Sequence, residues 1–294
     1  KLTTLLGESP VARQQRQTEG VAWLADLAAA YGSEAANDAS DETGDSSAIG
    51  SGFLVLTAPL LRWAANQLHQ RLRAASTIFT LDFAKQALRT TLADQLLPLI
   101  QRTLVLEMHV ARLQGLLPGA TPAERFAGFV DRLRDRAVAL ALLEEYPVLA
   151  RQLVIKVKQT TTAIGEILER LSQDWPTIIE RFNGGDNPGA LVELAIGAGD
   201  THREGRSVAI LRFASGLRLV YKPRSLAIDT HFQEMLTWLN QHGAQPVFRT
   251  LTILNREDYG WAEFVAAAAC TTPVEIERFY QRQGGYLAIL HALN

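Results

Sequence analysis

Apolar residues recur at three-, four- and seven-residue intervals over most of residues 1–182, the spacing of one face of an α-helix. Residues 1–31 are therefore predicted to be helical, and residues 53–182 to form a run of amphipathic helices. Gly115, Pro118-Gly119 and the capping box predicted at Thr121-Pro122-Ala123-Glu124 mark boundaries between these helices. One apolar stripe is expected to face a core: Leu92, Leu96, Leu99, Leu106, Val110 and Leu113.

Residues 32–52 separate the two helical stretches and contain no apolar run. They are rich in Ser, Asp, Glu, Ala and Gly. Such a segment buries too little apolar surface to offset the entropy lost on ordering. We predict an acidic disordered or mobile loop, with an acidic docking tail as the functional alternative.

The period of the pattern changes after residues 183–189, where Asn183-Gly184-Gly185-Asp186-Asn187-Pro188-Gly189 predicts a loop and a domain boundary. Beyond it, alternating apolar residues predict strands, with one helix over residues 228–241 and another over 279–293. The expected fold class is α+β, a large all-helical region followed by a small lobe with an antiparallel sheet in residues 183–294. The predicted strands cover residues 191–196, 208–213, 217–222, 248–255 and 259–265.

Composition excludes several classes of protein. The chain is 47% hydrophobic and 20% charged with a net charge of −2, so no basic field would attract nucleic acid. A single cysteine, Cys270, excludes a disulfide framework and a multi-cysteine zinc site, and favours a cytoplasmic location. The longest apolar runs, residues 53–61 and 137–143, are too short to span a bilayer. The absence of an initial methionine and the apolar pattern running up to Asn294 suggest a fragment.

The third predicted strand places Arg218, Val220 and Lys222 on one face. An apolar residue two positions before a lysine suits a nucleotide site, with Val220 against the base and Lys222 at the phosphates. Pro223 ends the strand directly after the lysine. The alternative is an edge hairpin whose lysine is merely solvated.

The order of elements adds weight to the nucleotide site. Strand, loop, strand, strand, helix, strand, strand is the order of a protein-kinase or lipid-kinase small lobe. In that arrangement Glu234 could form an ion pair with Lys222, although a solvated charge on the helix face is the alternative. Backbone groups near Glu263 and Val265 could bind the edge of an adenine, which makes both residues candidates for cofactor binding.

The polar loop between the first two strands, Gly199 to Arg206, carries Asp200 and His202. Together with Arg203 or Arg206, these side chains could position a phosphorylated substrate or move a proton. A turn-forming aspartate and a solvated histidine are the structural alternatives.

Several motifs in this order closely resemble the dehydratase domain of class II lanthipeptide (lantibiotic) synthetases, the LanM family. The resemblance extends from about residue 53 to the end and rests first on residues 199–208 and on Leu219-Val220-Tyr221-Lys222-Pro223-Arg224. Further matching segments are Arg102–Glu107, Ala111–Leu117, Glu145–Arg151, Tyr259–Phe264 and Phe279–Gly284.

The resemblance implies a kinase-like dehydratase closer to lipid kinases than to P-loop enzymes. Such enzymes use ATP and Mg²⁺ to phosphorylate Ser and Thr of a ribosomal precursor peptide, and then eliminate phosphate to give dehydroalanine and dehydrobutyrine. By this likeness Lys222 corresponds to the phosphate-contacting lysine, and Asp200 and His202 to loop residues of the elimination step.

The same resemblance implies parts that these residues do not include. A catalytic loop with Asp, His and Asn, the metal ligands and a zinc-dependent cyclase domain are expected beyond Asn294. Residues 1–294 alone are therefore expected to bind nucleotide weakly and to catalyse nothing. A non-catalytic peptide-binding scaffold and a plain protein or lipid kinase are the alternative functions.

Overall fold

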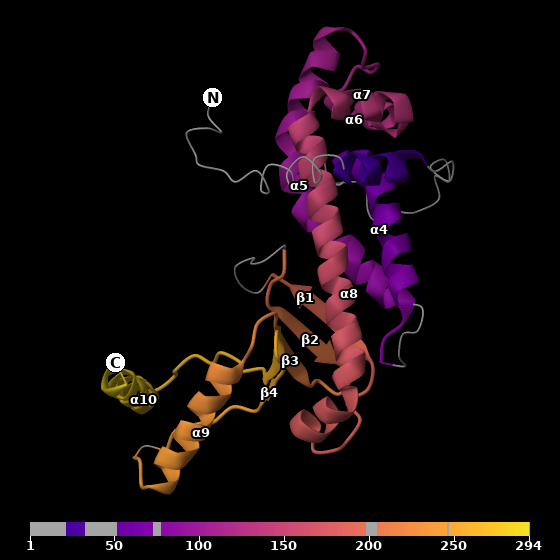
Figure 1. Ribbon diagram of the computed structural model, residues 1–294. Helices are drawn as coiled ribbons and strands as arrows, with labels where there is room; N and C mark the ends of the chain where they lie inside the picture. Colours follow the sequence, from indigo (N-terminus) through magenta and orange to yellow (C-terminus); the bar gives the residue numbers. More distant parts are fainter. Residues whose placement is uncertain (1–21, 33–51, 73–77, 198–204, 246, 294) are drawn as a thin grey trace, which may run out of the picture. The chain divides into compact units, whose positions relative to one another are not determined.

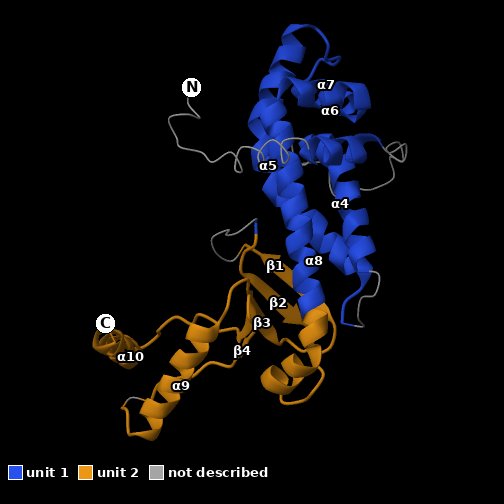
Figure 2. Cartoon of the chain, viewed as in Figure 1, with its two compact units in different colours: residues 1–170, 203–205 blue, residues 171–202, 206–294 orange. Residues whose placement is uncertain are grey.

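The computed structural model describes residues 22–32, 52–72, 78–197, 205–245 and 247–293 (Figure 1). The predictions for residues 1–21 and 33–51, and those for Asp200 and His202, lie outside these ranges. The chain divides into two compact units, residues 1–170 with 203–205 and residues 171–202 with 206–294 (Figure 2). The division falls inside one long helix, ahead of the glycine-rich loop at residues 183–189.

The elements described in the first unit are helices, as the spacing of apolar residues predicts. Residues 22–32 form a helix. The later elements are a 3₁₀ helix η2 (Leu54–Thr57), α4 (Ala58–Arg71), α5 (Leu81–Leu113), α6 (Pro122–Arg134), α7 (Arg136–Glu145) and the first part of α8 (Pro147–Asn183). The predicted capping box at the start of α6 is present, with the Thr121 hydroxyl accepting from the Glu124 N–H at 3.2 Å.

The core stripe of α5 differs in part from the prediction. Leu92 and Leu96 are buried as expected, but Leu106 and Leu113 are 54% and 70% exposed. The buried line advances four residues at a time, which turns it gradually around the helix and away from the seven-residue repeat. It consists of Ala84, Leu88, Leu92, Leu96, Ile100 and Leu104.

The second unit contains a five-stranded antiparallel sheet of order β1-β2-β3-β5-β4. The described residues are therefore mostly helical with one small antiparallel sheet, in agreement with the α+β class. The strands are β1 (Leu191–Ile196), β2 (Ala209–Phe213), β3 (Arg218–Lys222), β4 (Ile253–Asn255) and β5 (Gly260–Glu263). Helix α9 (Ala227–Gln241) lies between β3 and β4 in the chain, and α10 (Pro273–Ala292) follows β5.

The fourth strand is much shorter than predicted, since the N–H groups of residues 248, 251 and 252 donate to side-chain oxygens. The Thr252 carbonyl still accepts from the Glu263 N–H of β5. The N–H groups of Phe248 and Leu251 donate to side-chain oxygens of Asn240 and Gln233 on α9, both at 2.8 Å. Helix α10 also differs, because it begins at Pro273, where a Thr272 capping box starts it, and not at residue 279.

One face of the sheet forms the core of the second unit. Leu211, Phe213, Leu219 and Trp261 are fully buried there. The Trp175 ring on α8 lies 5.2 Å from the Phe213 ring. The buried Asp174 carboxylate accepts from Arg256 at 2.6 and 2.8 Å, from the Tyr259 hydroxyl at 3.0 Å and from Trp261 Nε1 at 2.8 Å. These donors satisfy a carboxylate that would otherwise be costly to bury.

Candidate functional site

The opposite face of the sheet carries a row of aliphatic side chains that crosses every strand in register. Directly paired residues of antiparallel strands point to the same face. Val220 and Ile210 are half-buried in the centre of this row, and Ala262 is buried beside them. We call these side chains the aliphatic row: Ala195, Ile210, Val220, Ala262 and Ile253.

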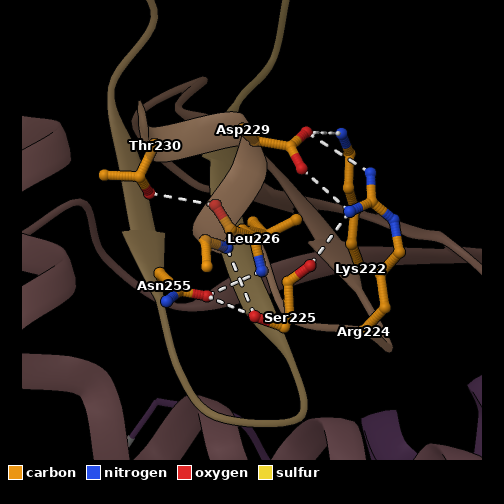
Figure 3. A network of polar contacts seen from close by, with 8 residues as sticks. Lys222, Arg224, Ser225, Leu226, Asp229, Thr230 and Asn255 are labelled. Atoms are coloured by element: carbon orange, nitrogen blue, oxygen red, sulfur yellow. Dashed lines mark hydrogen bonds and ion pairs between the residues drawn. The ribbon is translucent and has the colours of Figure 1, made fainter. Parts of the chain in front are cut away.

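Lys222 lies two residues after Val220, on the same face and at the end of β3. Its Nζ donates to Asp229 Oδ1 at 3.2 Å (Figure 3). The Lys222 side chain is 30% exposed and the Asp229 side chain 22% exposed. A carboxylate in the first turn of α9 therefore holds the ammonium group at the rim of the aliphatic row.

Gly260 explains how α9 approaches β3 so closely. It pairs with Lys222 across the sheet, and a Cβ atom placed on it would lie 2.5 Å from Leu226 Cδ1 and 2.8 Å from the Leu254 carbonyl oxygen. Leu226 is fully buried and directly precedes α9. Only glycine at position 260 leaves room for the Leu226 side chain. The packing of Leu226 in turn positions the first turn of α9, which carries Asp229.

A second cation shares the same carboxylate. Arg224 Nη1 donates to Asp229 Oδ2 at 2.8 Å, and Nη2 lies 3.3 Å from Oδ1. Burial alone would raise the pKa of Asp229, but the hydrogen bond from Arg224 and the charge of Lys222 outweigh it and hold that pKa below its ordinary value. The group Lys222, Arg224 and Asp229, which we call the cation cluster, thus has two positive charges and one negative charge.

The segment between β3 and α9 is anchored by the end of β4. Asn255 Oδ1 accepts from the Leu226 N–H at 2.6 Å and from the Ser225 hydroxyl at 3.4 Å (Figure 3). The Thr230 hydroxyl donates to the Leu226 carbonyl at 3.0 Å. These bonds fix the backbone on which both Arg224 and Asp229 stand.

Comparison with known proteins assigns the family. A family model described as "Domain of unknown function (DUF4135)" matches residues 146–294, which include the whole sheet and the cation cluster. The chain belongs to the DUF4135 family.

A curated relative of this DUF4135 chain is named for the biosynthesis of lacticin 481 and lactococcin. It is the "Lacticin 481/lactococcin biosynthesis protein LcnDR2" of Lactococcus lactis subsp. lactis, 23% identical over 212 residues. The match covers 69% of the chain but only 23% of the relative's length. Together with the family model, it confirms the resemblance to the LanM family.

In this DUF4135 chain, Lys222 does not pair with Glu234 as the sequence suggested. Its partner is Asp229, while Glu234 lies 2.9 Å from His231 Nδ1 with its side chain 66% exposed. Glu234 comes five residues after Asp229, so it lies about 140° further around the helix. Asp229 was missed because the sequence does not show which turn of α9 reaches the lysine.

Glu234 instead lines an open groove of about 370 Å³ along α9. The groove is bounded by Thr230, Gln233, Thr237, Trp238 and Gln241 on the helix, and by Thr250, Leu251 and Ile253 on the segment leading into β4.

Glu263 and Val265 lie at and beyond the end of β5. The Glu263 carboxylate accepts from the Thr252 N–H at 2.8 Å and from Arg249 Nη2 at 2.7 Å. Burial would raise the pKa of Glu263, but the backbone hydrogen bond from Thr252 and the contact with Arg249 lower it overall. The Glu263 N–H donates to the Thr252 carbonyl at 3.0 Å and so is not available to an adenine. Val265 is 47% exposed.

Asp200 and His202 lie outside the described residues, so their roles stay predictions.

Within the described ranges, no three His, Cys, Asp or Glu side chains are grouped to hold a metal ion. No helix among those ranges is long and apolar enough to cross a membrane.

Proposed function

We propose that this chain supplies the nucleotide-binding part of a lanthipeptide dehydratase. Such an enzyme phosphorylates Ser and Thr of a ribosomal precursor peptide with ATP, and then eliminates phosphate to give dehydroalanine and dehydrobutyrine. The observation that carries the proposal is Lys222, held by a carboxylate of α9 at the rim of the aliphatic row. The order β1-β2-β3-α9-β4-β5 supports a kinase-like small lobe, and the LanM resemblance supplies the substrate class.

The residues present fit ATP. The aliphatic row offers a half-buried apolar surface of the kind that packs against a purine ring. At its end the cation cluster carries one positive charge in excess, which favours phosphate oxygens. Bound ATP would supply the phosphoryl group. Lys222 would bind its phosphate oxygens, and Asp229 would keep the Lys222 ammonium in place. We assign no magnesium ligand within the described residues, since they contain no group of three or more His, Cys, Asp or Glu side chains that could hold a metal ion.

Phosphorylation and elimination form one chemical sequence on the peptide. A hydroxyl group is a poor leaving group, whereas its phosphate ester leaves readily. Removal of the α-proton by a base then forms the Cα–Cβ double bond as the Cβ–O bond to phosphate breaks. We assign this second step to Asp200 and His202, on the LanM resemblance of their loop.

Mass spectrometry of the precursor peptide tests this assignment in the whole protein. Peptide incubated with ATP and wild-type protein is expected to lose water at Ser and Thr. With His202→Ala or Asp200→Ala, phosphorylated peptide should accumulate instead, because only elimination is impaired.

The same measurement separates the alternatives. A stable phosphopeptide as the final wild-type product would indicate a plain kinase. A peptide that binds but stays unmodified would indicate a scaffold. Normal dehydration by His202→Ala would refute its assigned role.

A further inference from the structure

Arg224 occupies an unusual position within the cation cluster. Its side chain is 55% exposed, whereas the carboxylate that it shares with Lys222 is only 22% exposed. Arg224 Nη1 also donates to the Ser225 carbonyl at 2.9 Å. The guanidinium group is therefore held beside the proposed nucleotide site and still open to solvent.

The contacts of Asp229 are unequally divided between the two cations. Lys222 touches only Oδ1, while Arg224 contacts both carboxylate oxygens. An ion pair with an exposed arginine contributes little to stability. A phosphate group carries more charge than a carboxylate and presents oxygens that match the guanidinium fork. A phosphate could thus replace Asp229 as the partner of Arg224, while Asp229 keeps its contact with Lys222.

We propose that Arg224 is a second phosphate-binding residue of this site, which exchanges its Asp229 partner for phosphate oxygens when a ligand binds. The carrier of that phosphate is either the nucleotide or the phosphorylated Ser or Thr of the peptide, and this part of the inference rests on the proposed function. Both carriers present the same chemistry to the guanidinium group.

Isothermal titration of the whole protein tests the inference with two ligands, ATP and a precursor peptide synthesised with one phosphoserine. Arg224→Gln is expected to weaken binding of at least one ligand about tenfold, the loss of one charged bidentate contact. Arg224→Lys should lose less, because it keeps the charge without the fork. The matched control is Arg134→Gln, another exposed arginine paired with an aspartate, Asp131.

The two ligands identify the carrier. A loss confined to ATP assigns Arg224 to the nucleotide, and a loss confined to the phosphopeptide assigns it to the peptide intermediate. Wild-type affinity of Arg224→Gln for both ligands, with a circular dichroism spectrum like that of wild type, would overturn the inference.

A double variant separates direct binding from an effect through Asp229. If Arg224 binds phosphate itself, Arg224→Gln should still weaken binding when it is introduced into Asp229→Asn. If the loss disappears there, Arg224 only orients the carboxylate and the inference is wrong.

These titrations do not depend on turnover. Arg224-dependent binding by a protein that never modifies the peptide would refute the proposed function and support this inference. Normal dehydration of the peptide, with equal ligand affinities for wild type and Arg224→Gln, would support the proposed function and refute this inference.

Discussion

At the scale of single residues, the acid that holds Lys222 is the main correction to the sequence analysis. The kinase-like order of elements predicts an acidic partner from the helix after the third strand, and the structure provides one from that helix. It is Asp229 in the first turn and not Glu234 further along. A residue's spacing along a helix fixes its face, but which face meets β3 depends on the packing of Leu226 against Gly260.

Replacing the two acids separately tests this assignment. Asp229→Asn should lower the kcat of phosphorylation about tenfold, since the lost charge contact is worth roughly 1–2 kcal/mol at a partly exposed site. The KM for ATP should change less, because Lys222 itself remains. Glu234→Gln should behave like wild type in the same steady-state assay. The opposite pattern, with Glu234→Gln impaired and Asp229→Asn normal, would contradict the structure.

The lowered pKa values of Asp229 and Glu263 predict a loss of stability in acid. A carboxyl group whose pKa is lower in the folded state than in the unfolded state stabilises the fold above the unfolded pKa, which is about 4. That contribution disappears as the pH falls through the lower, folded pKa. The urea midpoint of the whole protein should therefore fall as the pH drops below about 4.

Isosteric variants identify the source of this acid sensitivity. Asp229→Asn and Glu263→Gln should each make the urea midpoint less dependent on pH in that range. Glu193→Gln, at an exposed pair with Arg212, serves as the control. Unchanged pH dependence in both test variants would show that neither carboxylate contributes.

At the scale of elements, Gly260 controls the approach of α9 to the sheet. Gly260→Ala should destabilise the protein by about 1–3 kcal/mol, because the added Cβ overlaps Leu226 and the Leu254 carbonyl. Gly284→Ala is the matched control, since a Cβ there meets no atom within 4 Å and alanine favours the helix. Chemical denaturation measures both. Equal stability of Gly260→Ala and wild type would refute the packing argument.

The sequence predicted most elements of the second unit, but it placed the start of β4 too early and the start of α10 too late. β1 has the predicted bounds, and β2, β3 and α9 each begin one residue away from prediction. Alternating apolar residues and the turn at residues 214–216 are local signals, so these elements could be predicted. The segment 248–252 could not be, because its N–H groups bond to distant side chains such as Gln233 and Glu263.

The candidate site could be predicted only in part, because local sequence patterns do not show which strands pair or where loops run. Val220 and Lys222 share a face of one strand, which alternation alone reveals. Their neighbours Ile210 and Ala262 are brought beside Val220 only by strand register. The roles of Arg224 and Asn255 depend on a loop whose path local sequence does not specify.

At the scale of the whole molecule, the family match and the candidate site fall in the same part of the chain. The family match covers the sheet, α9 and α10. The chain spans 23% of the length of its curated relative. The reaction proposed here therefore belongs to the whole protein, and its central claim is that Lys222 binds the nucleotide phosphates.

The most direct test of that claim compares two lysines in the whole protein, with the precursor peptide, ATP and mass spectrometry. Lys158 also pairs with an aspartate, at 2.8 Å from Asp26, but belongs to the helical unit. Lys158→Ala should dehydrate the peptide as wild type does. Lys222→Ala should leave the peptide without phosphate and without dehydration. Phosphorylated or dehydrated peptide formed by Lys222→Ala at the wild-type rate would contradict the account.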